Sequence, residues 1–409
     1  MPVSTLRMAW RNLGRNRRRT GLAVAAIALS VMLVLVYDAV ARGYGDWLLA
    51  TVTGPMLGHV QAHAPEWRKD RAMDRTLVSA SRIVTTLRGD PAVASASARV
   101  YAPALAALGE EGFAVVVIGL ESAAESRANG LLAGLREPLA GRRVLIGKLL
   151  ADLMGVRAGD VVALVGQGAD GSLANDLYTV ADLVQTPVDM VNRQAVIMDL
   201  GEAQVLFAMP DEAHEIVVQA RDPERLDQLV ARVAAVPGLS RAEVLDWRRL
   251  APEMLNLLEL VRVAWVFVLV LVFVAAAAGV ANTMLMATFE RTREFGMLLA
   301  LGTGPGRIVR LILVESVVLG LVGAAIGAAL GLGLVALTHG PGIDYARLTG
   351  GGPREISFAG LNWSLRLYPT LAVVDVVRVV VAAVVTALLA SLWPAARAAR
   401  LEPARALRE

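Results

Sequence analysis

The sequence contains no cysteine, only four histidines, and few aromatic residues (5%). Without cysteine the chain has no disulfide bond, no thiolate metal site and no lipid-modified cysteine. The formal net charge of +3 is small for 409 residues, so the distribution of charge along the chain says more than its sum.

Motifs that would mark an enzyme are also missing. The dipeptide Gly147-Lys148 has no glycine five residues before it and is followed by leucine, so it is not a phosphate-binding loop. His214-Glu215 lacks the second histidine of a zinc-protease motif, and no serine lies in a nucleophile elbow. We expect no catalytic residue and no metal site, so any energy for transport must come from another chain.

Long apolar runs dominate what is present. The chain is 56% hydrophobic, with a mean hydropathy of +0.55. Four runs are long enough to cross the ~30 Å hydrocarbon layer as helices: about Leu22–Ala41, Val263–Thr288, Ile308–Leu337 and Leu371–Leu392. They hold almost no mid-membrane charge, which argues against an ion-driven carrier. The sequence predicts a membrane protein with four transmembrane helices.

Arginines near the ends of the runs predict the orientation. They lie before the first run, between the second and third, and after the fourth: Arg7, Arg11, Arg15, Arg17, Arg18, Arg19; Arg291, Arg293, Arg307, Arg310; and Arg397, Arg400, Arg405, Arg408. Positive charge near span ends marks the cytoplasmic side. Both termini are therefore expected in the cytoplasm, with Arg42–Arg262 and Thr338–Thr370 outside. No small-residue cleavage site follows the first run, so we interpret it as a retained anchor.

The segment Val3–Arg19 places Leu6, Trp10 and Leu13 on one helical face, which predicts an amphipathic helix on the inner leaflet. A positive flank without a helix is the alternative.

The region between the first two runs has a mixed pattern that predicts an α+β domain. Strands are expected at Gly58–Ala64, Ala98–Leu108, Phe113–Gly119, Arg143–Gly147, Val161–Gly166, Leu177–Val184, Gln194–Met198, Glu215–Ala220 and Ala242–Asp246. Helices are expected at Leu77–Leu87, Lys148–Met154, Leu200–Ala208 and Pro223–Val236. His59 and His63 flank Gln61 on one strand face; with no third ligand nearby, surface polar residues are favoured over a metal site.

From Trp247 the pattern is helical. If the helix is continuous from Pro252 to Thr288 it is about 55 Å long, some 20 Å more than the bilayer core. The excess would form a rigid stalk. A break near Glu259–Arg262 is the alternative, although no glycine or proline lies there.

The third run carries Gly323, Gly327 and Gly331 at four-residue spacing, with Gly320 before them, which predicts a close helix-packing face. Frequent glycine in membrane helices is the alternative reading. Glu315 lies near Arg310, so a structural pair is as plausible as a substrate role. Asp375 and Arg378 can pair at i, i+3.

Three motifs carry a family resemblance. The first motif closely resembles the NTM…ERTREIG…ALGA pattern of ABC-transporter permeases of the FtsX/MacB/LolC–LolE group. It consists of Asn282-Thr283-Met284, the stretch from Glu290 to Met297 (ERTREFGM) and Ala300-Leu301-Gly302. The N-terminal Trp10–Thr20 stretch and the C-terminal Pro394–Arg408 stretch resemble the ends of the same family. Ile146–Asp160 and Gly342-Ile343-Asp344 look closer to the LolC/LolE branch.

The resemblance implies a mechanism called mechanotransmission. A separate ABC ATPase dimer, which would hold ATP and Mg, docks between the second and third spans, and its movement is relayed through the stalk to the outer domain without a channel. The docking residues implied are Glu290, Arg291, Thr292, Arg293, Glu294, Phe295, Gly296, Met297, Leu301 and Gly302. Arg291 and Arg293 could instead only fix topology. Further partners implied are a second permease copy or paralogue, membrane lipid, a lipoprotein substrate and a periplasmic chaperone; no cofactor in this chain and no nucleic acid are expected.

We expect the chain to lie in a bacterial inner membrane with its large domain in the periplasm. The expected segments, in order, are a cytoplasmic helix (1–20), the first span (21–41), a periplasmic α+β domain (42–251), the stalk and second span (252–289), a coupling region (290–307), the third span (308–337), an outer loop (338–370), the fourth span (371–392) and a cytoplasmic tail (393–409). The favoured function is lipoprotein release from the inner membrane. Efflux of a drug, peptide or toxin, and FtsX-like regulation of a periplasmic hydrolase, remain alternatives.

Overall fold

The computed structural model describes residues 17–127, 130–133, 135, 137–344, 356–358, 361–363 and 366–402. The predicted amphipathic helix at Val3–Arg19 lies almost wholly outside these residues. The chain forms two compact units: a helical unit of Met1–Asp46, Leu257–Gly350 and Arg366–Glu409, and an α/β unit of Trp47–Asn256 and Gly351–Leu365.

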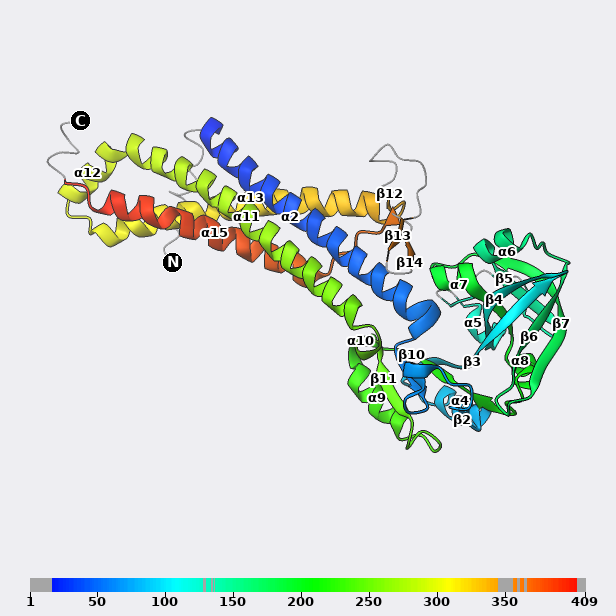
Figure 1. The fold of residues 1–409 in the computed structure, drawn as a ribbon. Coiled ribbons are helices and arrows are strands. Elements are labelled where there is room, and N and C mark those ends of the chain that lie inside the picture. The colour runs from blue at the N-terminus through cyan, green and yellow to red at the C-terminus, as the bar shows by residue number, and fades with distance from the viewer. Residues whose placement is uncertain are drawn as a thin grey trace. The chain divides into compact units, whose positions relative to one another are not determined.

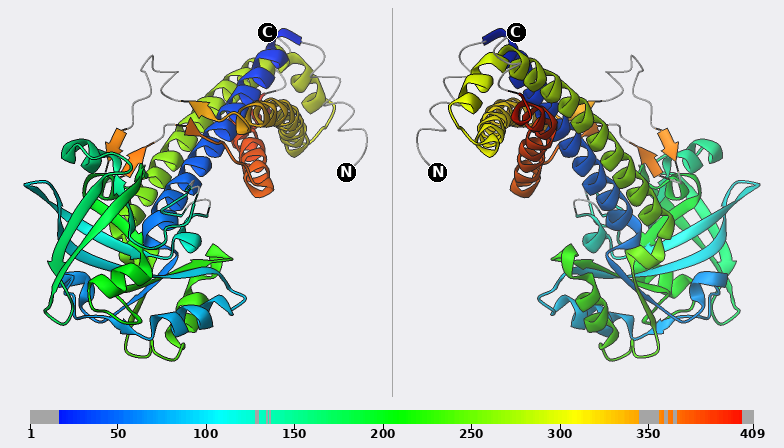
Figure 2. Two further views of the ribbon diagram at one scale, coloured as in Figure 1. Left: turned by 90° about the vertical axis from the view of Figure 1, so that its right-hand side faces the viewer. Right: turned by 90° about the vertical axis from the view of Figure 1, so that its left-hand side faces the viewer.

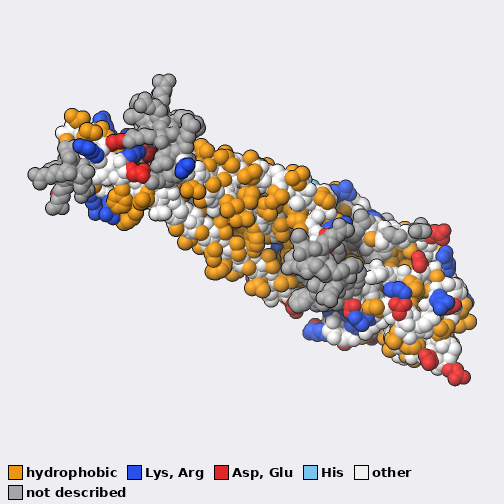
Figure 3. Space-filling view, turned by 90° about the horizontal axis from the view of Figure 1, so that it is seen from above, with side chains coloured by type: hydrophobic (Ala, Val, Ile, Leu, Met, Phe, Trp, Pro, Cys, Tyr) orange, Lys and Arg blue, Asp and Glu red, His pale blue; other side chains and the backbone are white. Residues whose placement is uncertain are grey.

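Among its described residues the helical unit has four long helices and one short helix, drawn in Figure 1: α2 (Arg17–Val52), α11 (Pro252–Glu290), α13 (Pro305–His339), α15 (Val373–Ala399) and the short α12 (Thr292–Ala300). Each long helix is long and apolar enough to cross a membrane. Hydrophobic side chains cover much of their visible surface in Figure 3. The prediction of four membrane helices is confirmed.

Helix α11 runs without a break through Glu259–Arg262, so the continuous alternative is the one observed. Its 39 residues correspond to about 58 Å at 1.5 Å per residue. It begins later than the helical pattern predicts, because α10 (Trp247–Leu250) is a separate turn that ends at Ala251, with φ −133° and ψ 69°. A residue before proline avoids the helical region, which explains the break before Pro252.

The glycine face of α13 packs against α2. A Cβ on Gly323 would lie 2.7 Å from Cβ of Ile27, and one on Gly327 would lie 2.9 Å from Cα of Ala28. A Cβ on Gly331 would lie somewhat farther away, 3.2 Å from Cβ of Leu35, whereas Gly320 faces α15. Close backbone approach of this kind needs small residues. The predicted packing face therefore exists, and its partner is the first long helix.

Ion pairs join α2 to α15 at one end of the helices. The predicted Asp375–Arg378 pair is present at 3.2 Å. Arg378 also bonds to Asp38 at 2.9 Å, and Arg42 reaches Asp375 at 3.1 Å. The Arg378 guanidinium lies 4.9 Å from the ring centroid of Trp265 on α11. This end therefore holds three of the long helices.

The α/β unit is organised by a nine-stranded sheet in the order β11-β1-β10-β3-β4-β8-β5-β7-β6. The strands are β1 (Val60–His63), β3 (Val93–Leu108), β4 (Glu111–Leu120), β5 (Arg143–Gly147), β6 (Val161–Gln167), β7 (Leu173–Val184), β8 (Ala195–Asp199), β10 (Glu215–Ala220) and β11 (Glu243–Asp246). An additional antiparallel pairing of β6 with the far half of β3, at Ala104–Ala107, closes β3, β4, β8, β5, β7 and β6 into a barrel. Figure 2 shows the long β3 shared by barrel and open sheet.

The barrel encloses an apolar core that includes Val100, Val117, Ile146, Val196 and Met198. Helices and short strands complete the unit: η1 (a π-helical turn, Thr53–Leu57), α3 (Trp67–Asp70), α4 (Ala80–Arg88), α5 (Ser122–Glu125), α6 (Lys148–Met154), α7 (Asp189–Gln194), α8 (Leu200–Leu206), η2 (Pro223–Arg225), α9 (Leu226–Ala234), β2 (Leu77–Val78) and β9 (Glu212–Ala213). Short pairs also occur at β12 (Ile343–Asp344) with β15 (Arg366–Leu367), and at β13 (Ile356–Phe358) with β14 (Leu361–Trp363).

Most predicted elements are confirmed within a few residues, but two predictions are wrong. The helix expected at Leu77–Leu87 begins at Ala80, because Leu77 and Val78 pair as a strand with Ala213 and Glu212. Gln61 and His63 are buried, not surface residues, because β1 lies between β10 and β11 inside the sheet.

Candidate functional site

The predicted docking residues form a short helix and its flanking turns. Helix α11 ends at Glu290, Arg291 leaves the helical region with φ −104° and ψ 10°, and α12 begins at Thr292. Gly302 ends the turn with φ +82°, a conformation that favours glycine. Pro305 then occupies the first turn of α13, where its missing N–H costs nothing.

One side of α12 is buried inside the helical unit. Phe295 is 1% exposed and packs in a cluster with Ile308 and Ile312 of α13 and with Ala395 and Ala398 of α15. Gly296 is also buried. The side chains of this face fix α12 on the ends of two long helices, so they are supports and not a free surface.

The other side of α12 is open. Arg293 is exposed, Met297 is 49% exposed, and Leu301 is 83% exposed. Glu290 and Gly302 are exposed as well, while Thr292 and Glu294 are half-buried. Apolar side chains beside charged ones at a surface are typical of a protein-binding site.

Arg291 faces inward. Its Nη1 donates to both carboxylate oxygens of Glu315, at 2.9 and 3.0 Å, and its Nε donates to Glu294 at 3.2 Å. The guanidinium also lies 4.9 Å from the centroid of the Phe295 ring. The suggested partner of Glu315 was Arg310; the structure instead gives Arg291, because α12 folds back beside α13. Arg310 is exposed.

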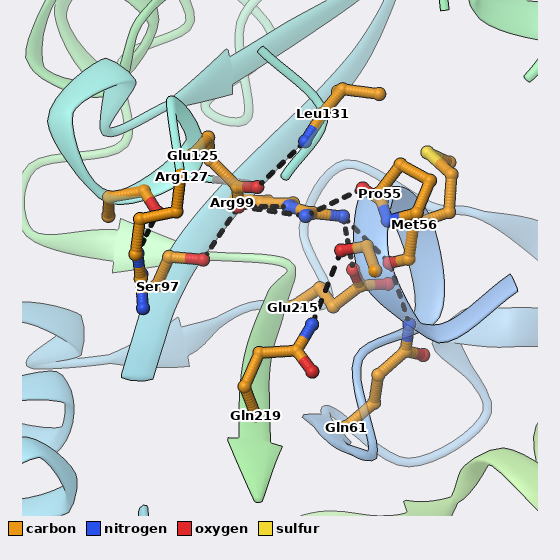
Figure 4. Close-up of polar contacts among 12 residues, drawn as sticks. Pro55, Met56, Gln61, Ser97, Arg99, Glu125, Arg127, Leu131, Glu215 and Gln219 are labelled. Atoms are coloured by element: carbon orange, nitrogen blue, oxygen red, sulfur yellow. Dashed lines mark hydrogen bonds and ion pairs between the residues drawn. The ribbon is translucent and has the colours of Figure 1, made fainter. Parts of the chain in front are cut away.

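A second site, not expected from the sequence, lies in the α/β unit. Arg99 of β3 is completely buried, and its Nη2 and Nε donate to Oε1 of Glu125, at 2.7 and 2.9 Å (Figure 4). Ser97 donates to the same oxygen at 2.7 Å. Glu215 of β10 lies on the other side, 3.8 Å from Nη1 of Arg99. A charged residue inside an otherwise apolar strand pattern was the available signal.

This buried arginine holds the turn that follows α2. Nη1 and Nη2 of Arg99 donate to the carbonyl oxygens of Met56 and Pro55, at 2.7 and 3.0 Å. The amide of Gln219 donates to the carbonyls of Thr53 and Gly54, at 2.8 and 3.2 Å. A helix end leaves carbonyls without partners and carries partial negative charge. Side chains of the sheet therefore satisfy every carbonyl from Thr53 to Met56 in η1.

Burial and charge set the protonation of this cluster. Burial alone would lower the pKa of Arg99, but Glu125 and Glu215 outweigh it and raise the pKa, so the guanidinium stays charged. Burial raises the pKa of the Glu215 carboxyl, while the charge of Arg99 opposes that shift. Burial also raises the pKa of the Tyr101 phenol, which donates to Glu215 at 3.2 Å.

Two family models match the chain. A MacB-like periplasmic core domain matches residues 20–236, and an FtsX-like permease C-terminal domain matches residues 266–403. The first match covers more than half of the chain.

Curated relatives agree with these matches. The lipoprotein-releasing system transmembrane protein LolC of Xylella fastidiosa is 23% identical over 96% of both chains. LolE of Haemophilus influenzae is 24% identical over 95% of this chain and 91% of its own length. LolC of Neisseria meningitidis is 23% identical over 65% of this chain. That match covers 64% of the Neisseria protein, which is just under two thirds of its length. The chain belongs to the family of ABC-transporter permeases that combine a MacB-like periplasmic core domain with an FtsX-like permease C-terminal domain.

Proposed function

We propose that this chain is the permease subunit that couples ATP hydrolysis by a separate cytoplasmic ATPase to movement of its own periplasmic domain. One observation carries the proposal. The short helix α12 connects two membrane-length helices, is anchored on one face by Phe295 and Arg291, and presents Met297 and Leu301 on the other. A firmly anchored helix with an open apolar and charged face suits the docking of a motor.

The route of the movement follows from helix continuity. An unbroken α11 of 39 residues resists compression along its axis better than two jointed helices would. Between α2, α11 and α15, the gap lined by Ile27, Phe273 and Ala383 leaves no room for a water molecule. A closed helix interior supports a relay that does not pass substrate between these helices.

We further propose that the transported substrate is a lipoprotein released from the inner membrane, because curated relatives that align over nearly the whole chain carry lipoprotein-releasing names. ATP and Mg would be held by a dimer of the partner ATPase, and the permease core would be completed by a second copy or a paralogue. The chain would lie in a bacterial inner membrane with both termini cytoplasmic. Efflux with an outer-membrane partner is the second candidate, favoured by the MacB-like core domain.

The docking assignment is tested by Glu290→Lys and by Gly296→Trp in the assembled complex. Glu290 is exposed at the end of α11, whereas Gly296 lies on the buried side of α12, so a tryptophan there would push the helix away from α13 and α15. Both variants should insert in the membrane but lose at least tenfold in export per ATP hydrolysed. Glu253→Lys, an equally exposed glutamate at the other end of α11, is the matched control. Normal export by both variants would refute the assignment.

The relay is tested by inserting Gly-Gly-Gly after Leu258, within α11. Three glycines would break the helix and decouple its two parts. Export should be abolished while the ATPase still co-purifies. The same insertion after Gly171, in the turn between β6 and β7, should be tolerated. Unchanged export from the Leu258 insertion would exclude a rigid relay. Mass spectrometry of the purified intact complex would identify the ATPase, any second permease and any bound lipoprotein.

A further inference from the structure

A cavity of about 360 Å³ opens in the α/β unit beside the turn that Arg99 holds. This volume lies within the usual range of small-molecule sites. Residues from seven elements line it, together with Arg71, which follows α3; among them are Met56, Leu57, Trp67, Val116, Met190 and Glu215. All of them belong to one compact unit, so the cavity is a feature of that unit alone.

The walls of the cavity are mostly apolar. Met56 and Leu57 come from η1, Pro103 from β3, Val116 from β4 and Met190 from α7. Met190 is 36% exposed and Pro103 is exposed, which places them toward the opening. Methionine side chains adapt to ligands of irregular shape. The walls therefore suit a flexible apolar chain.

Of the buried polar groups that line the cavity, Glu215, Tyr101 and Gln61 have hydrogen-bond partners, whereas the indole Nε1 of Trp67 has none within the described part of the chain. Glu215 is 4% exposed, accepts from Tyr101 and lies 3.8 Å from Arg99. Gln61 donates to the carbonyl of Met56 at 3.4 Å. A second negative charge placed here would be repelled by the Glu215 carboxylate, so an anionic group would not bind deep in the cavity.

Arg71 places a positive charge at the opening, where it also acts on the nearby Glu215 carboxyl. Arg71 is exposed, and its guanidinium stacks 4.3 Å from the ring centroid of Trp67. Among the described residues, no hydrogen bond or ion pair joins the Arg71 side chain to an acceptor. Its neighbours are engaged: Asp70 pairs with Arg75 at 3.1 Å, and Arg68 donates to the carbonyl of Leu250 at 3.0 Å. Stacking on Trp67 holds the guanidinium in place while leaving its donors free.

We propose that this cavity binds a single-chain anionic amphiphile. Its carboxylate or phosphate accepts hydrogen bonds from Arg71 at the opening, and its apolar chain lies against Leu57, Val116 and Met190. A guanidinium is the side chain best matched to such head groups. Free fatty acids and single-chain phospholipids share this chemistry. The bound chain would contact Met56, whose carbonyl Arg99 holds, so it would bind against the turn that joins α2 to the sheet.

The experiment uses the full chain in lipid nanodiscs and a decanoate probe with a photoreactive diazirine at the end of its chain. Irradiation followed by peptide mass spectrometry locates the adducts, and adducts in the membrane helices serve as an internal reference. Adducts are expected on peptides that contain Leu57 or Val116, which lie deeper in the cavity than Met190. Unlabelled decanoate should remove them, whereas decyltrimethylammonium, with the same chain and a positive head, should not. Whether decanoate or lysophosphatidylglycerol competes at the lower concentration distinguishes the fatty-acid source from the phospholipid source.

Single-residue variants distinguish binding of the probe at a specific site from its non-specific partitioning onto apolar surfaces. Arg71→Gln should reduce cavity adducts about tenfold or more, the effect of losing one hydrogen bond to a charged group. Arg82→Gln, at an exposed arginine of α4 that does not line the cavity, is the matched control and should leave them unchanged. Met190→Glu, at an exposed position, should also reduce them by placing a negative charge at the opening.

No cavity adducts, equal competition by the cationic amphiphile, or equal adducts in Arg71→Gln and the unaltered protein would overturn the proposal. The readout is binding and needs no ATPase. The protein could show cavity adducts that decanoate removes and that Arg71→Gln weakens, and yet fail to couple to an ATPase. That result would support the binding site and refute the proposed transport function.

Discussion

The guanidinium of Arg291 is bonded to both oxygens of the Glu315 carboxylate, which joins the start of the docking helix to the third membrane-length helix. The side chains are 16% and 8% exposed. At this burial each charge depends on the other, because an ion without its partner remains in a poorly solvated place.

Removing one member of this pair should therefore cost more than removing both. Glu315→Met removes the carboxylate that accepts from Nη1 of Arg291, leaves the guanidinium with its bond from Nε to Glu294, and should destabilise the protein by about 1–3 kcal/mol. The double variant Arg291→Met with Glu315→Met should be less damaged than the sum of the two single variants, with a coupling energy of about 1–3 kcal/mol. Thermal unfolding of all four proteins in the same detergent measures the cycle. Additive effects would contradict a direct pair.

The glycines of α13 provide a second prediction with an internal control. A leucine at Gly327 would collide with the backbone of Ala28, whereas nothing lies within 4 Å of a Cβ at Gly333. Gly327→Leu should separate α2 from α13 and lower stability by about 1–3 kcal/mol, and Gly333→Leu should be neutral. A cysteine pair engineered on the two helices would report their separation by cross-linking yield. Equal yields in the two variants would argue against the packing face.

The carbonyls of η1 depend on Arg99. Arg99→Met would leave Glu125 buried without its main partner, the carbonyl of Pro55 without a donor and that of Met56 with only the long bond from Gln61, with an expected cost of about 3–5 kcal/mol. Amide hydrogen exchange of Thr53–Leu57 should speed up accordingly. Arg142→Met removes an exposed pair with Asp176 and should cost less than about 1 kcal/mol. Slow exchange at Thr53–Leu57 in Arg99→Met would show that the turn is held by other contacts.

Stability of the α/β unit should fall as the pH drops below about 6.5. Burial lowers the pKa of His214 below its ordinary value of 6.5, so the unfolded chain binds a proton at a higher pH than the folded chain does. Nδ1 of His214 accepts from the Tyr101 N–H, and protonation of that nitrogen would break the bond. The contribution is complete above pH 6.5 and is lost as the pH falls toward the folded pKa.

The melting temperature at pH 7.5 and 5.5 measures this effect. His59 and His63 are shifted in the same direction by burial, whereas the raised pKa of Glu215 acts in the opposite direction. His214→Gln should reduce the difference between the two melting temperatures, because one of the three histidines that contribute to the pH dependence is then absent. An unchanged difference would exclude His214 as a contributor.

Local patterns were enough to predict most elements. β5 and α6 match the expected Arg143–Gly147 and Lys148–Met154 because Gly147 and Gly155 bound them clearly. The pairing of β6 with Ala104–Ala107 could not be predicted, since periodicity tells which face of a strand is buried but not which distant strand it meets. The closed barrel could therefore be recognised only in the structure.

The same limit applies to the two sites, since their positions along the chain could be predicted better than their long-range contacts. Motif resemblance placed α12 between two spans, but only the fold could tell that Arg291 faces Glu315 while Arg293 remains exposed. The Arg99 cluster joins residues from η1, β3, α5 and β10, which lie far apart in the sequence. Each is an ordinary polar residue when read alone, and the contacts become visible only after β10 pairs with β3.

The salt bridges of Arg42 and Arg378 with Asp38 and Asp375 also limit how the membrane helices can move. Sliding α2 along α15 by one helical turn, about 5 Å, would separate Arg378 from Asp38 and Arg42 from Asp375 at once, while the Asp375–Arg378 pair within α15 would remain. A tilt of both helices as a pair would separate none. These two ion pairs therefore favour motions in which α2 and α15 swing together over motions in which one slides along the other.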